Sequence, residues 1–296
     1  GLLHEGENSI TIRLISVYGP PSITPDKPFR IFSDNLSIEL KGVWRYRTTA
    51  PMERKPNSFF IQWQPCGLFN AMIAPLLRHP LRGILWYQGE SNDANPQDYG
   101  ALFTALIRDW RERGYRADLP FCFVQLPLYG EAAQNTEESS WALIRDAQRQ
   151  ALALPATGMA AALDLGEWND LHPLNKKGVG FRLAAAIEKL VYGEENSSPG
   201  PTLKKVVRDG EGLVLSFEHC AAGLVADEPV WVTVIGEDAK PVRLEAQISG
   251  GSELVIDTAL VRGACKVLYA WADNPQDRQL YNSEGLPALP FTASGF

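Results

Sequence analysis

Two short segments of this 296-residue chain carry side chains suited to general-base chemistry. The first segment contains Gln88, Glu90, Ser91 and Asn92. The second contains His172, with Asp170 two residues before it. A histidine beside a carboxylate can accept a proton while the carboxylate holds its tautomer and stabilises the imidazolium. The types and spacing of these residues therefore favour catalysis over a structural role for His172.

Neither segment supplies a recognisable nucleophile. Ser91 lies in Gly-Glu-Ser-Asn-Asp, where Asp93 replaces the second glycine of a nucleophile elbow. We therefore expect Ser91 to cap its loop or to position Glu90. The histidines are scattered without HxH or HExxH spacing, and no Walker or dinucleotide glycine pattern occurs. The sequence thus predicts no metal site and no phosphate-binding loop.

Alternating strand and helix patterns position both segments. Buried-strand patterns are found at 83–87, 120–126 and 158–164. Each is followed by a helical pattern, at 95–114, 140–152 and 179–193. Consecutive βα units predict a parallel sheet with right-handed crossovers. The Gln88 and His172 segments follow the first and third strands, so we expect them at one carboxyl edge of the sheet.

The flanking regions have the two-residue period of β-strands. Patterns at 9–16, 36–40 and 42–46 predict the closing strands of an incomplete β-domain over residues 1–48. A helical pattern from Gly67 is expected to kink or restart at Pro75. After a linker, residues 202–296 are predicted to form a small antiparallel module. Its expected strands are 213–217, 230–235, 242–246, 254–257 and 266–271.

Composition argues against two classes of partner. The net charge of −7 and the absence of a basic stripe disfavour nucleic acid. No segment approaches the run of about 20 apolar residues that a membrane span needs. The cysteines form no CxxC pair, and Cys122 and Cys265 lie in apolar runs where buried thiols are expected.

Taken together, these motifs resemble the sialate O-acetylesterase family of SGNH-type hydrolases. The resemblance is carried by 86–92, 164–167, 170–173, 175–176 and 180–184, and it continues at 70–75, 110–111, 119–121, 124–126, 145–148 and 281–291. It implies an α/β fold with a three-layer αβα arrangement, of which residues 49–195 would be the C-terminal part. It also implies removal of O-acetyl groups from carbohydrates by a serine acyl-enzyme mechanism, with no cofactor and no metal. A periplasmic or extracellular location follows from the same resemblance.

The resemblance assigns roles to individual residues. His172 matches the general base, and the usual DxxH spacing would put its orienting acid at position 169, which is Asn169 here. Asp170 and Glu90 therefore both remain candidates for the orienting carboxylate. Gln88 stands where related enzymes direct an amide toward the oxyanion, a contact worth about 3 kcal/mol in comparable sites. The alternative is that Gln88 only bonds to loop backbone.

Substrate contacts are expected at Trp168 and Asn92. Trp168 and Trp86 could each offer a flat face to a sugar ring, although tryptophans beside a sheet commonly belong to the core.

The largest departure from the family is the absence of its nucleophile block. The Gly-Gln-Ser-Asn type block and the glycine-bearing second block do not occur in these residues. We therefore expect a processed chain in a heterodimer, with a separate N-terminal polypeptide that supplies the serine. Two alternatives remain open: an acetyl xylan or xyloglucan esterase with the same chemistry, and a non-catalytic sugar-binding fragment.

Overall fold

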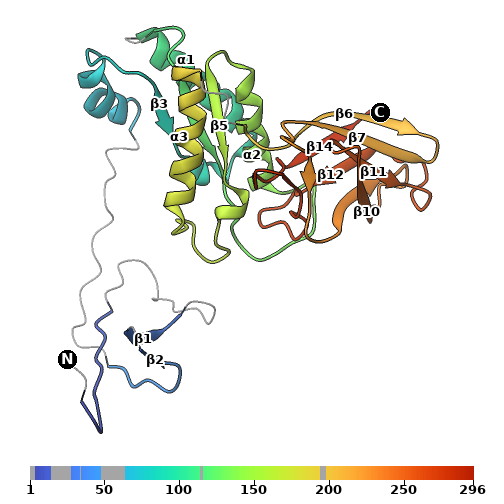
Figure 1. The fold of residues 1–296 in the computed structure, drawn as a ribbon. Helices are drawn as coiled ribbons and strands as arrows, with labels where there is room; N and C mark the ends of the chain where they lie inside the picture. Colours follow the sequence, from blue (N-terminus) through green and yellow to red (C-terminus); the bar gives the residue numbers. More distant parts are fainter. Residues whose placement is uncertain (1–3, 15–27, 34, 48–63, 114–115, 194–197) are drawn as a thin grey trace. The chain divides into compact units, whose positions relative to one another are not determined.

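The computed structural model describes residues 4–14, 28–33, 35–47, 64–113, 116–193 and 198–296. The chain divides into two compact units, residues 1–60 and residues 61–296. In the first unit, β1 (Arg30–Ser33) and β2 (Leu36–Glu39) pair antiparallel as a hairpin. The second unit contains a parallel sheet, its helices and a C-terminal β-module (Figure 1).

Most of the strands predicted for the first unit are not found. The strand predicted at 36–40 is confirmed as β2, but residues 9–14 and 42–46 form no strand, and β1 was not predicted. Residues 15 and 16 of the first pattern lie outside the described residues. Ile12 is 43% exposed and Leu14 56% exposed, so the alternating pattern here faces no core. Alternation alone does not make a strand without a partner to pair with.

The second unit contains the predicted parallel sheet. Its strands are β3 (Ile84–Trp86), β4 (Phe121–Gln125) and β5 (Thr157–Ala161), in the order β3-β4-β5. Both pairings are parallel. Every residue of β4 is buried, as expected for a central strand covered on both faces. The third strand ends earlier than predicted, because Leu163–Leu165 turn into a 3₁₀-helix.

Three long helices follow the three strands, which confirms the predicted βα order. They are α1 (Pro96–Arg113), α2 (Ser140–Gln150) and α3 (Lys176–Tyr192). The Ser139 and Asn175 side chains accept backbone N–H groups at the starts of α2 and α3, and left-handed Gly193 ends α3. None of the helices in the described part of the chain combines the length and apolar character needed to cross a bilayer.

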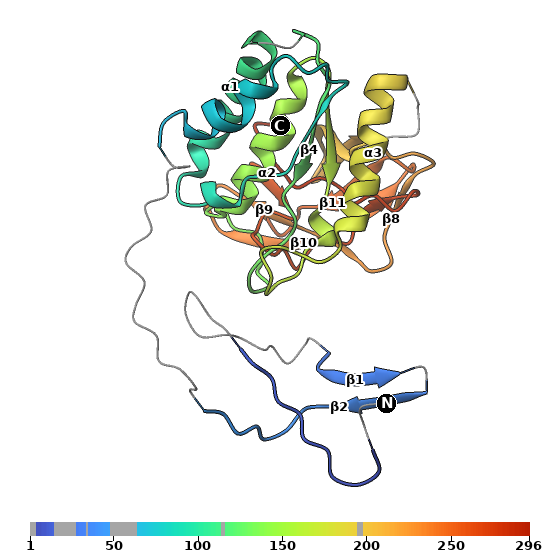
Figure 2. The ribbon, with the colours of Figure 1, turned by 90° about the vertical axis from the view of Figure 1, so that its left-hand side faces the viewer.

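Alternate residues of β4 face different helices. Phe121 and Phe123 pack in one cluster with side chains of α1 and α2. Cys122 and Val124 pack in another cluster with side chains of α3. Figure 2 shows α1 and α2 on one side of β4 and α3 on the other. Helices therefore cover both faces of the parallel sheet.

Short helical turns connect these elements. Phe69–Ile73 form a π-helical turn and Ala74–Leu76 a 3₁₀ turn, so the pattern does restart at Pro75 as predicted. A further 3₁₀ turn, Glu90–Asn92, follows β3 and leads toward α1.

The C-terminal module is antiparallel, as predicted. Its main sheet has the order β14-β12-β9-β10-β11-β7-β6, and a small sheet pairs β13 with β8. The five predicted strands are β7 (Gly212–Glu218), β9 (Val230–Ile235), β10 (Pro241–Ser249), β11 (Glu253–Asp257) and β12 (Lys266–Tyr269). Four were not predicted: β6 (Thr202–Asp209), β8 (Leu224–Val225), β13 (Tyr281–Asn282) and β14 (Phe291–Ser294).

The module shares a core with the parallel-sheet region. Leu128, which follows β4, and Leu163, which follows β5, belong to the buried cluster formed by the module's strands. Figure 1 shows the module, in orange to red, beside this region. The carboxyl ends of β4 and β5 are therefore anchored on the module.

The cysteines are free thiols. Cys122 is buried as predicted, and burial raises the pKa of its thiol to about 12. The prediction of a buried thiol is wrong for Cys265, which is exposed just before β12.

Candidate active site

The first predicted segment begins where β3 ends. Gln88 directs its Nε2 amide to Asn92 Oδ1 at 2.8 Å, so the two predicted site residues hold each other across the Glu90–Asn92 turn. An amide nitrogen carries two N–H donors, and only one serves this bond. Ser91, in the same turn, is exposed.

The backbone of this Gln88 loop is held from the interior. The carbonyl oxygen of Gln88 accepts the hydroxyl of Tyr99 at 2.9 Å and Nε2 of Gln148 at 3.2 Å. Gly89 is buried, and a Cβ at this position would lie 3.0 Å from Leu126 Cδ1 and 3.2 Å from Ile144 Cγ2. Glycine is favoured here because a Cβ would be tightly packed against side chains of α2 and of the segment after β4.

Glu90 acts electrostatically on two tyrosines. Burial, followed by the Glu90 charge, raises the pKa of Tyr87 to about 12. Burial is also the main cause that raises the pKa of Tyr99 to about 12, and Glu90 adds to it. Both phenols are therefore neutral at ordinary pH. The Glu90 carboxylate is therefore close enough to Tyr87 and Tyr99 for its charge to act on both phenols.

The second segment forms a loop between β5 and α3. Asp170 Oδ1 accepts the backbone N–H of His172 at 2.9 Å, and Glu167 Oε1 accepts the backbone N–H of Leu174 at 2.8 Å. These carboxylates close the loop by accepting its backbone donors. His172 itself is exposed at the loop surface. The Asp170 carboxylate therefore contacts the main chain of His172, and its predicted role in orienting the imidazole stays a prediction.

A salt bridge joins the two ends of the His172 loop region. Arg182 on α3 makes bonds of 2.6 and 2.8 Å to the carboxylate of Asp164, which precedes the loop. The same guanidinium donates to the carbonyl of Ala161 at the end of β5, at 2.7 Å. Both ionic side chains are largely buried, at 16% and 17% exposed. A bidentate arginine pair has fixed geometry, so it holds α3 against β5.

A contact links the residue before the Gln88 loop to the start of α3. The ammonium of Lys176, at the start of α3, lies 5.0 Å from the ring centroid of Tyr87, which immediately precedes Gln88. This distance is within the range of a cation–π contact. The structure thus brings the Gln88 loop and the start of α3 together.

The two tryptophans differ in environment. Trp86 packs edge-on against Trp110, with ring centroids 5.8 Å apart, and belongs to the core around β3. Trp168 is 39% exposed, and its backbone carbonyl accepts the N–H of Gly130 at 2.8 Å. Of the two tryptophans, Trp168 is the more exposed.

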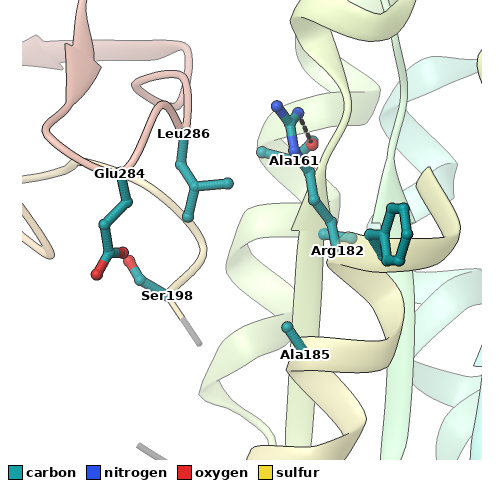
Figure 3. A pocket seen from close by; sticks show the side chains of 8 residues that line it. Ala161, Arg182, Ala185, Ser198, Glu284 and Leu286 are labelled. Atoms are coloured by element: carbon teal, nitrogen blue, oxygen red, sulfur yellow. Dashed lines mark hydrogen bonds between the residues drawn. The ribbon is translucent and has the colours of Figure 1, made fainter. Parts of the chain in front are cut away.

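Among the described residues, no group of three or more His, Cys, Asp or Glu side chains is arranged to hold a metal ion. A hollow of about 250 Å³ lies elsewhere, where α3 and β5 face the module (Figure 3). Its lining includes Arg182, Ser198, Glu284 and Leu286. Arg182 is the cationic residue in this lining, and its guanidinium is paired with the Asp164 carboxylate.

Sequence reasoning assigned no supporting role to the residues that hold the two loops. Arg145 and Gln148 lie four and seven residues after Trp141, on the buried stripe of α2. Long polar side chains on such a stripe are a signal for buried hydrogen-bond networks. Like Arg145 and Gln148, Asp164 and Arg182 were noted only within larger motifs, and their pairing was not predicted.

Comparison with known proteins identifies the family. Residues 59–189 match the family model described as carbohydrate esterase, sialic acid-specific acetylesterase. The chain belongs to this carbohydrate esterase family. It is 32% identical to the sialate O-acetylesterase of Mus musculus, over 93% of this chain and 53% of that protein, and 31% identical to that of Homo sapiens, over 76% and 48%. The family predicted from the motifs is confirmed.

A solved structure places the fold in the same family. A carbohydrate acetylesterase from Xanthomonas citri superposes with a TM-score of 0.72 at 38% identity, covering 77% of this chain and 54% of that one. The chain thus has a carbohydrate esterase fold, with a parallel sheet and an antiparallel C-terminal region. The chain spans about half the length of the curated sialate O-acetylesterases that it matches.

Proposed function

We propose that this chain forms half of the active site of an SGNH-type carbohydrate O-acetylesterase. The observation that carries the proposal is the Lys176–Tyr87 contact, which brings the residue before the Gln88 loop next to the start of α3, just after the His172 loop. Helices on both faces of the sheet fit the three-layer αβα arrangement of that class. We also propose three regions in the chain: the end of a β-domain at 1–48, the C-terminal part of the catalytic domain at 49–195, and a β-module at 202–296.

In the proposed mechanism, a serine hydroxyl attacks the acetyl carbonyl carbon while His172 takes the hydroxyl proton. The second N–H of the Gln88 amide, together with backbone N–H groups, stabilises the oxyanion. The tetrahedral intermediate expels the sugar oxygen, which receives the proton from His172. Water, activated by His172, then attacks the acyl-enzyme, releases acetate and restores the serine. Asp170 or Glu90 orients the imidazole.

We propose that the serine comes from a polypeptide segment outside these residues. Among the described residues, β3 pairs with β4 alone, so its other edge presents backbone hydrogen-bonding groups. Leu85 on β3 is 56% exposed. Apolar side chains of the neighbouring segments and of α1 are exposed as well: Leu68, Met72, Leu76, Leu81 and Leu102. A further strand laid along β3 would cover this apolar surface and carry a nucleophile to the same sheet edge.

Labelling with a serine-directed reagent tests this proposal. In a preparation with every co-purifying chain, we expect hydrolysis of an aryl acetate, with the label on a serine outside the present sequence. The variant His172→Ala should lower kcat by about a thousandfold. Label on Ser91, or full activity from a single 32.7 kDa chain, would refute a separate nucleophile.

The orienting carboxylate can be assigned with two isosteric variants, Asp170→Asn and Glu90→Gln. Each removes one negative charge and leaves an amide of the same shape. An asparagine oxygen can still accept the His172 N–H, so Asp170→Asn preserves the observed loop contact. We expect kcat to fall at least about a hundredfold in one variant and much less in the other. Wild-type rates in both would exclude both carboxylates.

A non-catalytic sugar-binding role is the second candidate. The module has a polar hollow of about 320 Å³, lined by Asp227, Glu228, Gln276, Arg278, Gln279 and Tyr281, whose groups suit sugar hydroxyls. This candidate predicts oligosaccharide binding without turnover even when all chains are present. Comparing rates on acetylated sialic acid and acetylated xylan would then separate the two esterase substrates.

A further inference from the structure

Gln148 on α2 bridges the carboxyl ends of two strands of the parallel sheet. Gln148 is 1% exposed. Oε1 accepts the backbone N–H of Leu126, just after β4, at 2.9 Å. Nε2 lies 3.2 Å from the carbonyl oxygen of Gln88 and 3.3 Å from the hydroxyl of Tyr99. One buried amide therefore joins the ends of β3 and β4 to α1.

These bonds fix the backbone from which the Gln88 side chain projects. The Gln88 carbonyl receives donors from Tyr99 and Gln148, so the peptide plane between Gln88 and Gly89 cannot rotate without breaking both. The far end of the Gln88 side chain is held by Asn92. Held at both ends, the Gln88 amide has a defined direction before substrate arrives, as an oxyanion donor must.

The same face of α2 continues this network into the C-terminal module. Arg145, one turn before Gln148, is fully buried and donates to the carbonyls of Leu126 and Pro127 at 2.9 and 2.8 Å. It also donates to Ala272 and Asp273 of the module, both at 2.7 Å. Residues three apart on a helix lie on one face, so Arg145 and Gln148 act on the same segment after β4.

We propose that Gln148 is a positioning residue for deacetylation, acting through the Gln88 amide with Tyr99 as its partner. The proposal rests on the proposed oxyanion role of Gln88. Gln148 itself need not touch the acetyl group. Losing its bonds would let Gln88 shift, and displacements near 1 Å can cost about a hundredfold in rate.

The variant Gln148→Met tests this in the native preparation with all its chains. Methionine keeps the length of the side chain and removes both hydrogen-bonding functions. We expect kcat on an aryl acetate to fall about 10- to 100-fold, with KM changed less than about threefold. Gln148→Glu keeps an acceptor for Leu126 and loses the donor to Gln88, so a similar loss is expected. Gln150→Met makes the same chemical change on an exposed position of α2 and should leave kcat unchanged.

A double-variant comparison separates positioning from general structural support. If Gln148 acts through Gln88, then Gln148→Met should lower kcat little further in a Gln88→Ala background. A full, multiplicative loss in that background would overturn the proposal. A Gln88→Ala effect of only a few fold would instead refute the proposed role of Gln88, whatever Gln148 does. Thermal unfolding of each variant gives the folded fraction by which kcat is corrected.

Tyr99→Phe keeps the proposal testable if both Gln148 variants fail to fold. It removes only the hydroxyl that donates to the Gln88 carbonyl. We expect kcat to fall about three- to tenfold with KM unchanged, because one of the two bonds remains. An unchanged kcat in folded Tyr99→Phe would overturn the inference.

Discussion

The Gln88 loop and the His172 loop are held in opposite ways. Buried uncharged groups on α1 and α2 hold the Gln88 loop from the core, through Tyr99 and Gln148. Acidic side chains hold the His172 loop from within, by accepting its own backbone donors. Gln88 is proposed to stabilise developing charge on the oxyanion, and a donor for that task works best when it is rigid. His172 is proposed to act as the base, which must take up a proton and give it back. The two modes of support suit those two proposed tasks.

This contrast predicts that buried polar groups near α2 matter most for stability. The largest effect is expected for Arg145→Leu. Burial lowers the pKa of Arg145, and the charge is retained through bonds to four carbonyl oxygens. Removing these donors leaves four buried carbonyl oxygens without hydrogen bonds, so we expect a loss of about 3–5 kcal/mol in the free energy of unfolding. Urea denaturation measures it.

Arg149→Leu is the matched control for this experiment. Arg149 is on the same helix, and it pairs with Asp146 at 2.7 Å, with the arginine side chain 33% exposed. Because the arginine of this pair is reached by solvent, we expect its removal to cost only about 1 kcal/mol. Equal losses in the two arginine variants would contradict the idea that the Gln88 side depends on the buried network.

The second prediction concerns the support of the His172 loop. Arg182→Leu removes two bonds to Asp164 and one to Ala161. We expect a loss of about 2–3 kcal/mol in unfolding free energy, because Asp164 is left largely buried without its partner. Asp164→Asn with Arg182→Leu should recover part of this loss, since no unpaired charge remains. A double variant less stable than Arg182→Leu would argue that the carboxylate has another essential partner.

The sequence predicts some of these features well and others poorly. The α1 boundaries follow from Asn95-Pro96 and from apolar spacing, which are local signals. The support of the loops depends instead on contacts between residues far apart, such as Gln148 with Gln88. Strand β6 was missed because Lys204, Lys205 and Arg208 obscure its apolar period at the sheet edge. Periodicity finds elements, whereas tertiary hydrogen bonds require the fold.

The third prediction compares a buried glycine in the Gln88 loop with an exposed glycine in α3, the helix that follows the His172 loop. Gly89→Ala would place a Cβ 3.0 Å from Leu126 Cδ1 and 3.2 Å from Gln148 Nε2. These neighbours are buried, so we expect a loss of roughly 1–2 kcal/mol and a lower kcat. Gly180→Ala, on an exposed turn of α3 with no heavy atom within 4 Å of the new Cβ, should stabilise by about 0.5–1 kcal/mol. If Gly89→Ala changed the unfolding free energy as little as Gly180→Ala does, the packing around the Gln88 loop would be able to make room for the added Cβ.

The smallest predicted effect concerns Tyr87, which precedes Gln88 and contacts Lys176 at the start of α3. Burial and then Glu90 raise the pKa of this phenol to about 12. Between pH 10 and pH 12 the unfolded chain loses the phenolic proton before the folded chain does. Stability from this group is therefore complete below pH 10 and is lost as the pH rises toward 12.

Tyr87→Phe should make the alkaline loss of stability shallower. The Tyr87 hydroxyl is buried with no hydrogen-bond partner among the described residues, so its removal should cost little at pH 8. Urea unfolding midpoints at pH 8, 10 and 11 for both proteins measure the difference in slope. A marked loss already at pH 8 would mean that the hydroxyl bonds a group outside the described residues. In the proposed assembly, the strand that pairs with β3 would be the first place to look for that group.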